Sequence, residues 1–324
     1  MGSEGAESMP AIETVEKVEA VPTVERSLIA VMAIVTASLL IPLPGNKYAL
    51  YLATKIWILI LYAIAFNVLF GYSGLLSFGH ALFFSGSAYT LGILVARLDY
   101  PLAVGFILGI AAATIFSAVV GTLSLRHREI HFAMVTLAFS MLFWGIVMKW
   151  RDVTGGEDGI TGFPRGFSMF WFYYFTVLVV VICSYLMYRF VKSDIGLILE
   201  GIRENETRVQ FSGHSTLKYR LYAMIVSGTF TGVAGVLWAL LDRTVTPTIA
   251  HWTFSAIPVI VTLLGGPQSF IGPAVGTIVY VIVQDLITKY TLYWQFIFGA
   301  AIVAVVLFFR GGIVGIIEGY FKGR

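Results

Sequence analysis

The segment GYSGLLSFGHALFFSG, residues 71–86, interrupts one of the most apolar parts of this chain. Residues 49–70 before it and 87–96 after it are almost entirely aliphatic and aromatic. Glycine weakens a helix, and a hydroxyl removed from water needs a hydrogen-bond partner. Polar, glycine-rich backbone between such apolar runs is therefore expected only where other protein or a water-filled cavity surrounds it.

The composition predicts a protein that crosses a membrane several times. The 324 residues are 58% hydrophobic and 12% charged, whereas soluble domains carry about 25% charged residues. The net charge of +3 is small, and the basic residues lie in short loops, so we expect no nucleic-acid partner. Cys183 is the single cysteine, and it lies in an apolar run, so the sequence holds no disulfide framework.

Apolar runs near the length needed to cross the hydrocarbon, about 20 residues, predict an all-α, polytopic helix bundle with about ten transmembrane helices. The predicted spans are 27–42, 49–70, 80–96, 101–123, 130–148, 168–190, 220–241, 252–265, 271–288 and 293–310. An even number of spans places both termini on one side. That side holds thirteen basic residues against seven on the other, which predicts that the N and C termini are cytoplasmic.

These spans divide the chain into a transmembrane domain, 27–318, and two tails. Residues 1–26 are expected to form an acidic, disordered cytoplasmic tail, and residues 319–324 a C-terminal tail. The tail lacks the basic region that directly precedes the apolar stretch of a secretory signal peptide. Two loops are longer than the rest, a periplasmic one at 149–167 and a cytoplasmic one at 191–219.

The cytoplasmic loop contains the pattern of an amphipathic helix. The helix is predicted to begin at Ser193 or Asp194 and to end at Gly213. Its two faces are an apolar stripe and a charged stripe, formed by Ile195, Ile198, Ile202 and Val209 and by Glu200, Arg203, Glu204, Thr207 and Arg208. Glu204 and Arg208 have the i,i+4 spacing of an ion pair. From these residues alone, an interfacial helix and a docking helix remain equally open.

Polar side chains recur along one face of the third predicted span. The spacing of Ser77, His80 and Ser87 puts them on one helical stripe. Thr136 and Ser140 form a shorter stripe on the fifth span. A hydroxyl bonded back to its own helix explains any single one of them. Together, on interrupted spans, they predict the lining of a solute path.

A second glycine-rich segment faintly repeats the first. GPQSF at 266–270 echoes GLLSF at 74–78, and each follows one span and opens the next. Glycines four residues apart, such as Gly228 and Gly232, let helices approach closely. The glycines assigned to helix breaks or close packing are Gly71, Gly74, Gly79, Gly265, Gly266 and Gly272.

Five longer segments follow one another in the chain: GYSGLLSFGHALFFSGSAYT, FAMVTLAFSMLFWGIVMKWRDVTGGEDGITGFP, IRENETRVQFSGHSTLKYRLYAMIVSGTFTGVAGVLWA, LLGGPQSFIGPAVGTIV and RGGIVGIIE. Together, over roughly residues 60–318, they resemble the LivM-type permease subunits of branched-chain amino acid ABC importers. The resemblance implies a multi-pass permease of the cell inner (plasma) membrane, in contact with lipid, that is not itself an enzyme. It also implies a LivH-type second permease, two LivG/LivF-type ATPase subunits and a periplasmic substrate-binding protein as partners.

The resemblance further implies that the segment 196–213 docks on an ATPase. The coupling residues would be Gly196, Glu200, Arg203, Glu204, Asn205, Arg208 and Gly213. Glu200-Gly201 departs from the small or basic pair that is common there. No Walker A pattern occurs in the sequence, so ATP and Mg²⁺ are expected on the partner ATPases and no cofactor in this chain. Branched-chain amino acids are the expected solute, and urea or short amides are the alternative.

Shorter patterns point to other chemistries. GYSG places Ser73 in a G-x-S-G pattern with His251 as a candidate base, but an intramembrane protease needs neither ten spans nor a docking helix. An ion-coupled secondary transporter places charged residues at the membrane midplane, whereas Lys55 and Asp285 lie toward span ends, where their side chains can reach the surface. RHREIH at 126–131 lacks the H-E-x-x-H spacing, so no metal site is predicted.

Overall fold

The computed structural model describes residues 47–127, 129–166 and 168–290, together with 296, 299, 300, 312, 313 and 315. The predicted tails and the predicted span 27–42 lie outside the described residues, as does nearly all of the span 293–310. Every other predicted span is confirmed as a helix, with ends within a few residues of those expected.

Five helices in the described part of the chain are long and apolar enough to cross a membrane. They are α2 (Lys47–Ser73), α4 (Leu102–Ser124), α5 (Glu129–Lys149), α7 (Met169–Val191) and α9 (Thr216–Asp242). The shorter apolar helices are α3 (His80–Gly92), which runs into a π-helical turn at Ile93–Arg97, α10 (Trp252–Gly265) and α11 (Gly272–Thr288). α2 and α4 are rich in leucine, isoleucine and alanine, whereas α7 is built mostly from aromatic residues and valine.

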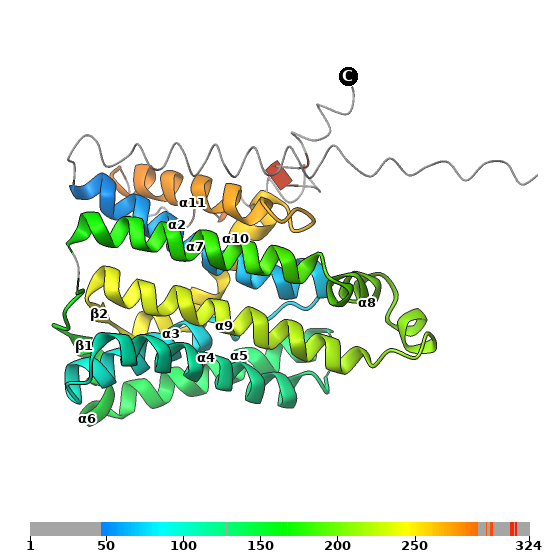
Figure 1. Ribbon diagram of the computed structural model, residues 1–324, viewed down its shortest axis with the longest axis horizontal. Helices are drawn as coiled ribbons and strands as arrows, with labels where there is room; N and C mark the ends of the chain where they lie inside the picture. The colour runs from blue at the N-terminus through cyan, green and yellow to red at the C-terminus, as the bar shows by residue number, and fades with distance from the viewer. Residues whose placement is uncertain are drawn as a thin grey trace, which may run out of the picture.

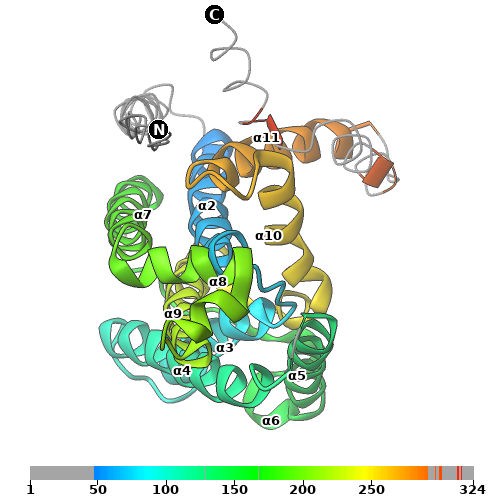
Figure 2. The ribbon, with the colours of Figure 1, turned by 90° about the vertical axis from the view of Figure 1, so that its right-hand side faces the viewer.

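The helices form a bundle with α2, α3 and α9 at its centre (Figures 1 and 2). α2 and α9 are largely buried, and every residue of α3 except Thr90 is buried. α4, α5 and α7 instead expose large apolar side chains, including Ile107, Leu142 and Leu178. An apolar outer surface of this extent is typical of helices that face lipid or a partner subunit.

The two long loops lie at opposite ends of the bundle, as the topology predicts (Figure 1). One end, which we call the strand end, carries α6 (Arg151–Thr154), β1 (Ile160–Thr161) and β2 (Thr244–Val245). The two strands pair antiparallel, with Ile160 opposite Val245. The other end, the α8 end, carries α8 (Asp194–Phe211), which lies across the ends of α2 and α9 (Figure 2).

Small residues set the spacing between α9 and its neighbours. A side chain on Gly228 or Gly232 would overlap Ser117 or Ala113 of α4. The predicted role of this pair in close helix packing is therefore confirmed.

Candidate functional site

The break between α2 and α3 begins at a glycine that the backbone requires. α2 ends at Ser73, Gly74 has a φ of +72°, and α3 begins only at His80. This left-handed conformation costs a residue with a side chain about 1–2 kcal/mol. Gly74 therefore sets the direction in which the chain leaves α2.

Hydroxyls from two other helices satisfy amides that the break leaves without helical partners. The amide of Phe78 donates to Oγ1 of Thr136 on α5 over 3.1 Å. The amide of Ala81 donates to Oγ of Ser255 on α10 over 2.7 Å. A buried amide without a partner costs about 1–3 kcal/mol, so these hydroxyls hold the break within the bundle. Thr136 was among the predicted residues, whereas Ser255 was missed because a lone serine near a helix start carries no distinctive pattern.

His80 connects three helices through a chain of hydrogen bonds. Oγ of Ser227 on α9 donates to the Ala65 carbonyl of α2 over 2.6 Å, and it lies 2.8 Å from Nε2 of His80. Ser227 has one hydroxyl proton, and that proton goes to the carbonyl, which can only accept. Nε2 of His80 must therefore carry a hydrogen and donate it to Ser227.

The remaining predicted path residues are also fully buried. Ser77 accepts from the amide two residues further on over 3.2 Å, and Ser87 donates to the carbonyl three residues before it over 2.8 Å. Ser140 donates across to the Ala250 carbonyl over 3.4 Å. The structure thus gathers Ser77, His80 and Thr136 around the break and places the other two further along α3 and α5.

The second glycine-rich break meets the last turns of α2, and α8 contacts the same turns at the α8 end. Nδ2 of Asn67 donates to the Ser269 carbonyl over 3.4 Å, and a side chain on Gly71 would overlap the Pro267 carbonyl. Arg203 of α8 donates from its guanidinium to the Gly71 carbonyl. The segment GPQSF therefore packs against the last turns of α2, just before GLLSF, and we call this contact together with Arg203 the break junction.

At the second break, backbone packs directly on backbone. A side chain on Gly265 would overlap the Gly272 carbonyl, and one on Gly272 would overlap the Gly266 carbonyl. Gly312, which follows the last predicted span, also packs against Gly266. α10 and α11 therefore cross at a separation that only glycine allows.

Helix α8 is divided at Asn205, although the sequence predicts one continuous helix. Asn205 has φ −157° and ψ 96°, outside the helical range. Its side-chain oxygen accepts from the Arg208 amide over 3.0 Å and so caps the second part of the helix. Asparagine favours such caps because its short side chain can reach the backbone.

The division of α8 removes the ion pair that the sequence predicts. Glu204 and Arg208 lie on opposite sides of Asn205, and within the described residues no ion pair joins them. Glu206 instead pairs with Arg220 of α9 over 3.1 Å. The second part of α8 is thereby fastened to α9.

The faces of α8 differ sharply in exposure. Leu199 and Ile202 are buried, whereas Leu197 is 67% exposed and Phe211 is 89% exposed. Leu199 is missing from the predicted apolar stripe, which was drawn through the isoleucines. Of the predicted coupling residues, Gly196 is buried at the turn from α7 and Glu200 is half-buried, while the exposed ones are Arg203, Glu204, Asn205, Arg208 and Gly213.

The residues of the protease hypothesis are not paired. Oγ of Ser73 is buried and donates to the Leu69 carbonyl over 2.6 Å. The ring of His251 packs against Trp144 and bonds to Thr253. Neither side chain has the nucleophile–base contact that this chemistry needs.

Comparison with known proteins decides the family. Residues 48–306 match the family model described as branched-chain amino acid transport system / permease component. The chain belongs to this family. As a member it is a multi-pass transport permease and not a catalytic enzyme.

Individual relatives agree with the family assignment. The permease is 26% identical over 326 residues to the high-affinity branched-chain amino acid transport system permease protein LivM of Salmonella typhimurium, covering 90% of this chain and 76% of the relative. It is 27% identical over 270 residues to a probable LivM of Methanocaldococcus jannaschii, covering 70% of this chain and 78% of the relative. A probable LivH of the same organism is 26% identical over 198 residues, covering 57% of this chain and 61% of the relative. No solved structure matches the chain.

Proposed function

We propose that this permease carries branched-chain amino acids through the inner (plasma) membrane as a subunit of an ATP-binding-cassette importer. Its partners would be a LivH-type permease, two LivG/LivF-type ATPases that hold ATP and Mg²⁺, and a periplasmic binding protein. The family and the LivM relatives support the solute class. The proposal of an ATPase partner rests on the surface of α8. This helix exposes Leu197 and Phe211, while its Arg203 donates to the Gly71 carbonyl at the break junction.

We place the α8 end in the cytoplasm, with about ten spans and both termini on that side. The excess of basic residues in the segments assigned to that side supports this orientation. The α8 end would then face the ATPases, and the strand end would face the binding protein.

Replacing Phe211 with aspartate tests the ATPase contact. An aromatic side chain that is 89% exposed at this end is typical of an anchor for a partner subunit. A carboxylate there would lose the apolar contact and place a charge in the interface. We expect the Phe211→Asp permease still to co-purify with its partner permease. The amount of ATPase that co-purifies should fall at least about tenfold, because hot-spot residues commonly contribute about 2 kcal/mol or more to the free energy of binding.

The control is Leu98→Asp, which changes an exposed apolar residue just after the π-helical turn at the strand end. It should leave the ATPase content unchanged. ATPases retained at wild-type level by the Phe211→Asp complex, with normal leucine uptake in proteoliposomes, would refute docking through this face.

We also propose that the buried seam of α3 opens as part of the solute path during transport. Ser77 and Ser87 are closed off from solvent in the structure, so they can line a path only if α3 separates from its neighbours. Cysteine is nearly the size of serine and serves as the probe, in a Cys183→Ala background. Cysteines at these two positions should react with a small water-soluble thiol reagent during ATP-driven turnover but not at rest.

Ser124→Cys gives the matched control, because Ser124 is equally buried and its hydroxyl bonds back to its own helix, α4. It should remain unlabelled in both states. Absence of labelling at both α3 positions during active uptake would make these hydroxyls purely structural.

A further inference from the structure

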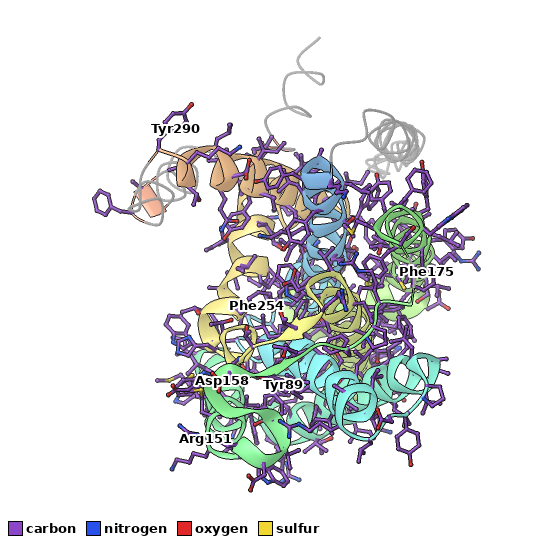
Figure 3. The ribbon with its side chains drawn as sticks, turned by 90° about the vertical axis from the view of Figure 1, so that its left-hand side faces the viewer. Tyr89, Arg151, Asp158, Phe175, Phe254 and Tyr290 are labelled. Carbon is purple, nitrogen blue, oxygen red and sulfur yellow. The ribbon has the colours of Figure 1, made fainter. Side chains whose placement is uncertain are left out.

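Four aromatic rings from four helices meet in the half of the bundle nearer the strand end. We call Tyr62, Phe84, Trp238 and Phe254 the aromatic box. Tyr62 and Phe84 are fully buried with ring centroids 4.9 Å apart, and Phe84 and Phe254 lie 4.8 Å apart. Trp238 completes the box at 5.8 Å from Phe254. Trp238 and Phe254 are only half-buried, and Phe254 lies near the middle of the bundle in the view onto the strand end (Figure 3).

Two opposite charges lie on the side of this box toward the strand end. Lys55 of α2 holds its ammonium 5.7 Å from the centre of the Trp238 ring. One turn further along α9, Asp242 accepts a hydrogen bond from Tyr51 over 2.8 Å. Lys55 and Asp242 are both half-buried, and each interacts electrostatically with the other. Within the described residues they nevertheless form no direct ion pair.

Neither charge has an ion-pair partner among the described residues. The ammonium of Lys55 makes no hydrogen bond to any described residue, although a half-buried cation normally finds one. Asp242 is the last residue of α9, at the negative end of the helix dipole, where the Arg165 guanidinium donates to the Leu240 and Leu241 carbonyls.

The combination matches the chemistry of an amino acid with an apolar side chain. Such a molecule carries a carboxylate, an ammonium and a hydrocarbon group on the same carbon atom. A carboxylate complements Lys55, an ammonium complements Asp242 and the face of Trp238, and the hydrocarbon group complements the aromatic box.

We infer that Lys55 and Asp242 receive the zwitterionic head of the solute at the entrance to the permease, with the aromatic box taking its side chain. This inference rests on the proposed function, because it names the contact made by the amino acid that the importer delivers. The rings touch one another in the structure, so the solute enters the box as the rings separate.

A double-mutant cycle separates this role from a structural one. Lys55→Gln, Asp242→Asn and the double variant are assembled with the partner permease, the ATPases and the binding protein in proteoliposomes. Each single variant should lower leucine uptake about tenfold, the effect of losing one hydrogen bond to a charged group. ATPase stimulation by the loaded binding protein should persist, because the α8 end is untouched.

The double variant decides the matter. If each residue holds one end of the solute, the double variant transports no better than the worse single variant. If the two charges serve only each other, removing both relieves the uncompensated charge and uptake recovers. Recovery would therefore overturn the inference. Lys149→Gln is the control, since Lys149 is an exposed lysine at the last residue of α5, at the strand end.

Photo-leucine, a diazirine analogue of leucine, provides a direct readout. Irradiation during uptake should yield adducts at or next to the residues of the aromatic box, Tyr62, Phe84, Trp238 and Phe254, and the double variant should lose them. Adducts confined to other segments, with normal uptake of the probe, would overturn the inference and leave the proposed function standing. A complete wild-type complex that takes up neither leucine nor photo-leucine would overturn both.

Discussion

Replacing Gly276 with alanine is expected to lower the free energy of unfolding of this permease by about 3 kcal/mol or more. The added methyl group would overlap the Val261 carbonyl of α10 and approach the Gly265 amide to 2.9 Å. Both are backbone atoms, so no side chain can rotate away, and α10 and α11 must separate along their length. The apparent melting temperature of the permease purified with its partner permease should fall by about 5–10 °C.

Gly145→Ala is the matched control for this substitution. Gly145 also lies within a helix, but a methyl group added there has no described atom within 4 Å apart from its chain neighbours and the backbone of its own helix. Alanine is more favourable than glycine in a helix by about 1 kcal/mol, so this variant should be as stable as the wild type or slightly more stable. Equal melting temperatures for the two variants would show that α10 and α11 are not packed as described.

Replacing Arg203 with alanine is expected to separate ATP hydrolysis from transport. The sequence places Arg203 on the charged face of the docking helix, but its guanidinium bonds inward to the Gly71 carbonyl at the break junction. Removing the guanidinium should leave the ATPases bound, because Leu197 and Phe211 remain. A movement of α8 would then no longer be transmitted to α2. We expect uptake per ATP hydrolysed to fall about tenfold, as for a lost hydrogen bond from a charged group.

The comparison with Phe211→Asp makes this prediction specific. Phe211→Asp should remove the ATPases, whereas Arg203→Ala should retain them and lose only the coupling. Arg189→Ala serves as control, because Arg189 is an exposed arginine of α7 whose side chain donates, among the described residues, to Tyr185 of the same helix. If the Arg203→Ala complex kept the wild-type uptake per ATP hydrolysed, the hydrogen bond to Gly71 would have no part in coupling ATP hydrolysis to transport.

The sequence by itself determined the helices of the bundle. Apolar runs of membrane length fix each span, since backbone groups in hydrocarbon can be satisfied only within a helix. It also located the break after α2, because Gly74 and its neighbours interrupt such a run. The amphipathic helix α8 was visible through its periodicity, and it ends at Phe211, two residues before the predicted end at Gly213.

Only the tertiary structure decided what those segments contact. Periodicity assigns Arg203 to a polar face but cannot show that its side chain bonds to Gly71. Periodicity also treats Asn205 as helical, although its side chain caps the start of the second part of α8. Lys55 and Asp242 are 187 positions apart, and two distant helices bring them together around Trp238. Local sequence determines the helices because the hydrogen bonds of a helix join residues close in the chain. The contacts of charged side chains and of helix breaks form only when separate helices pack together.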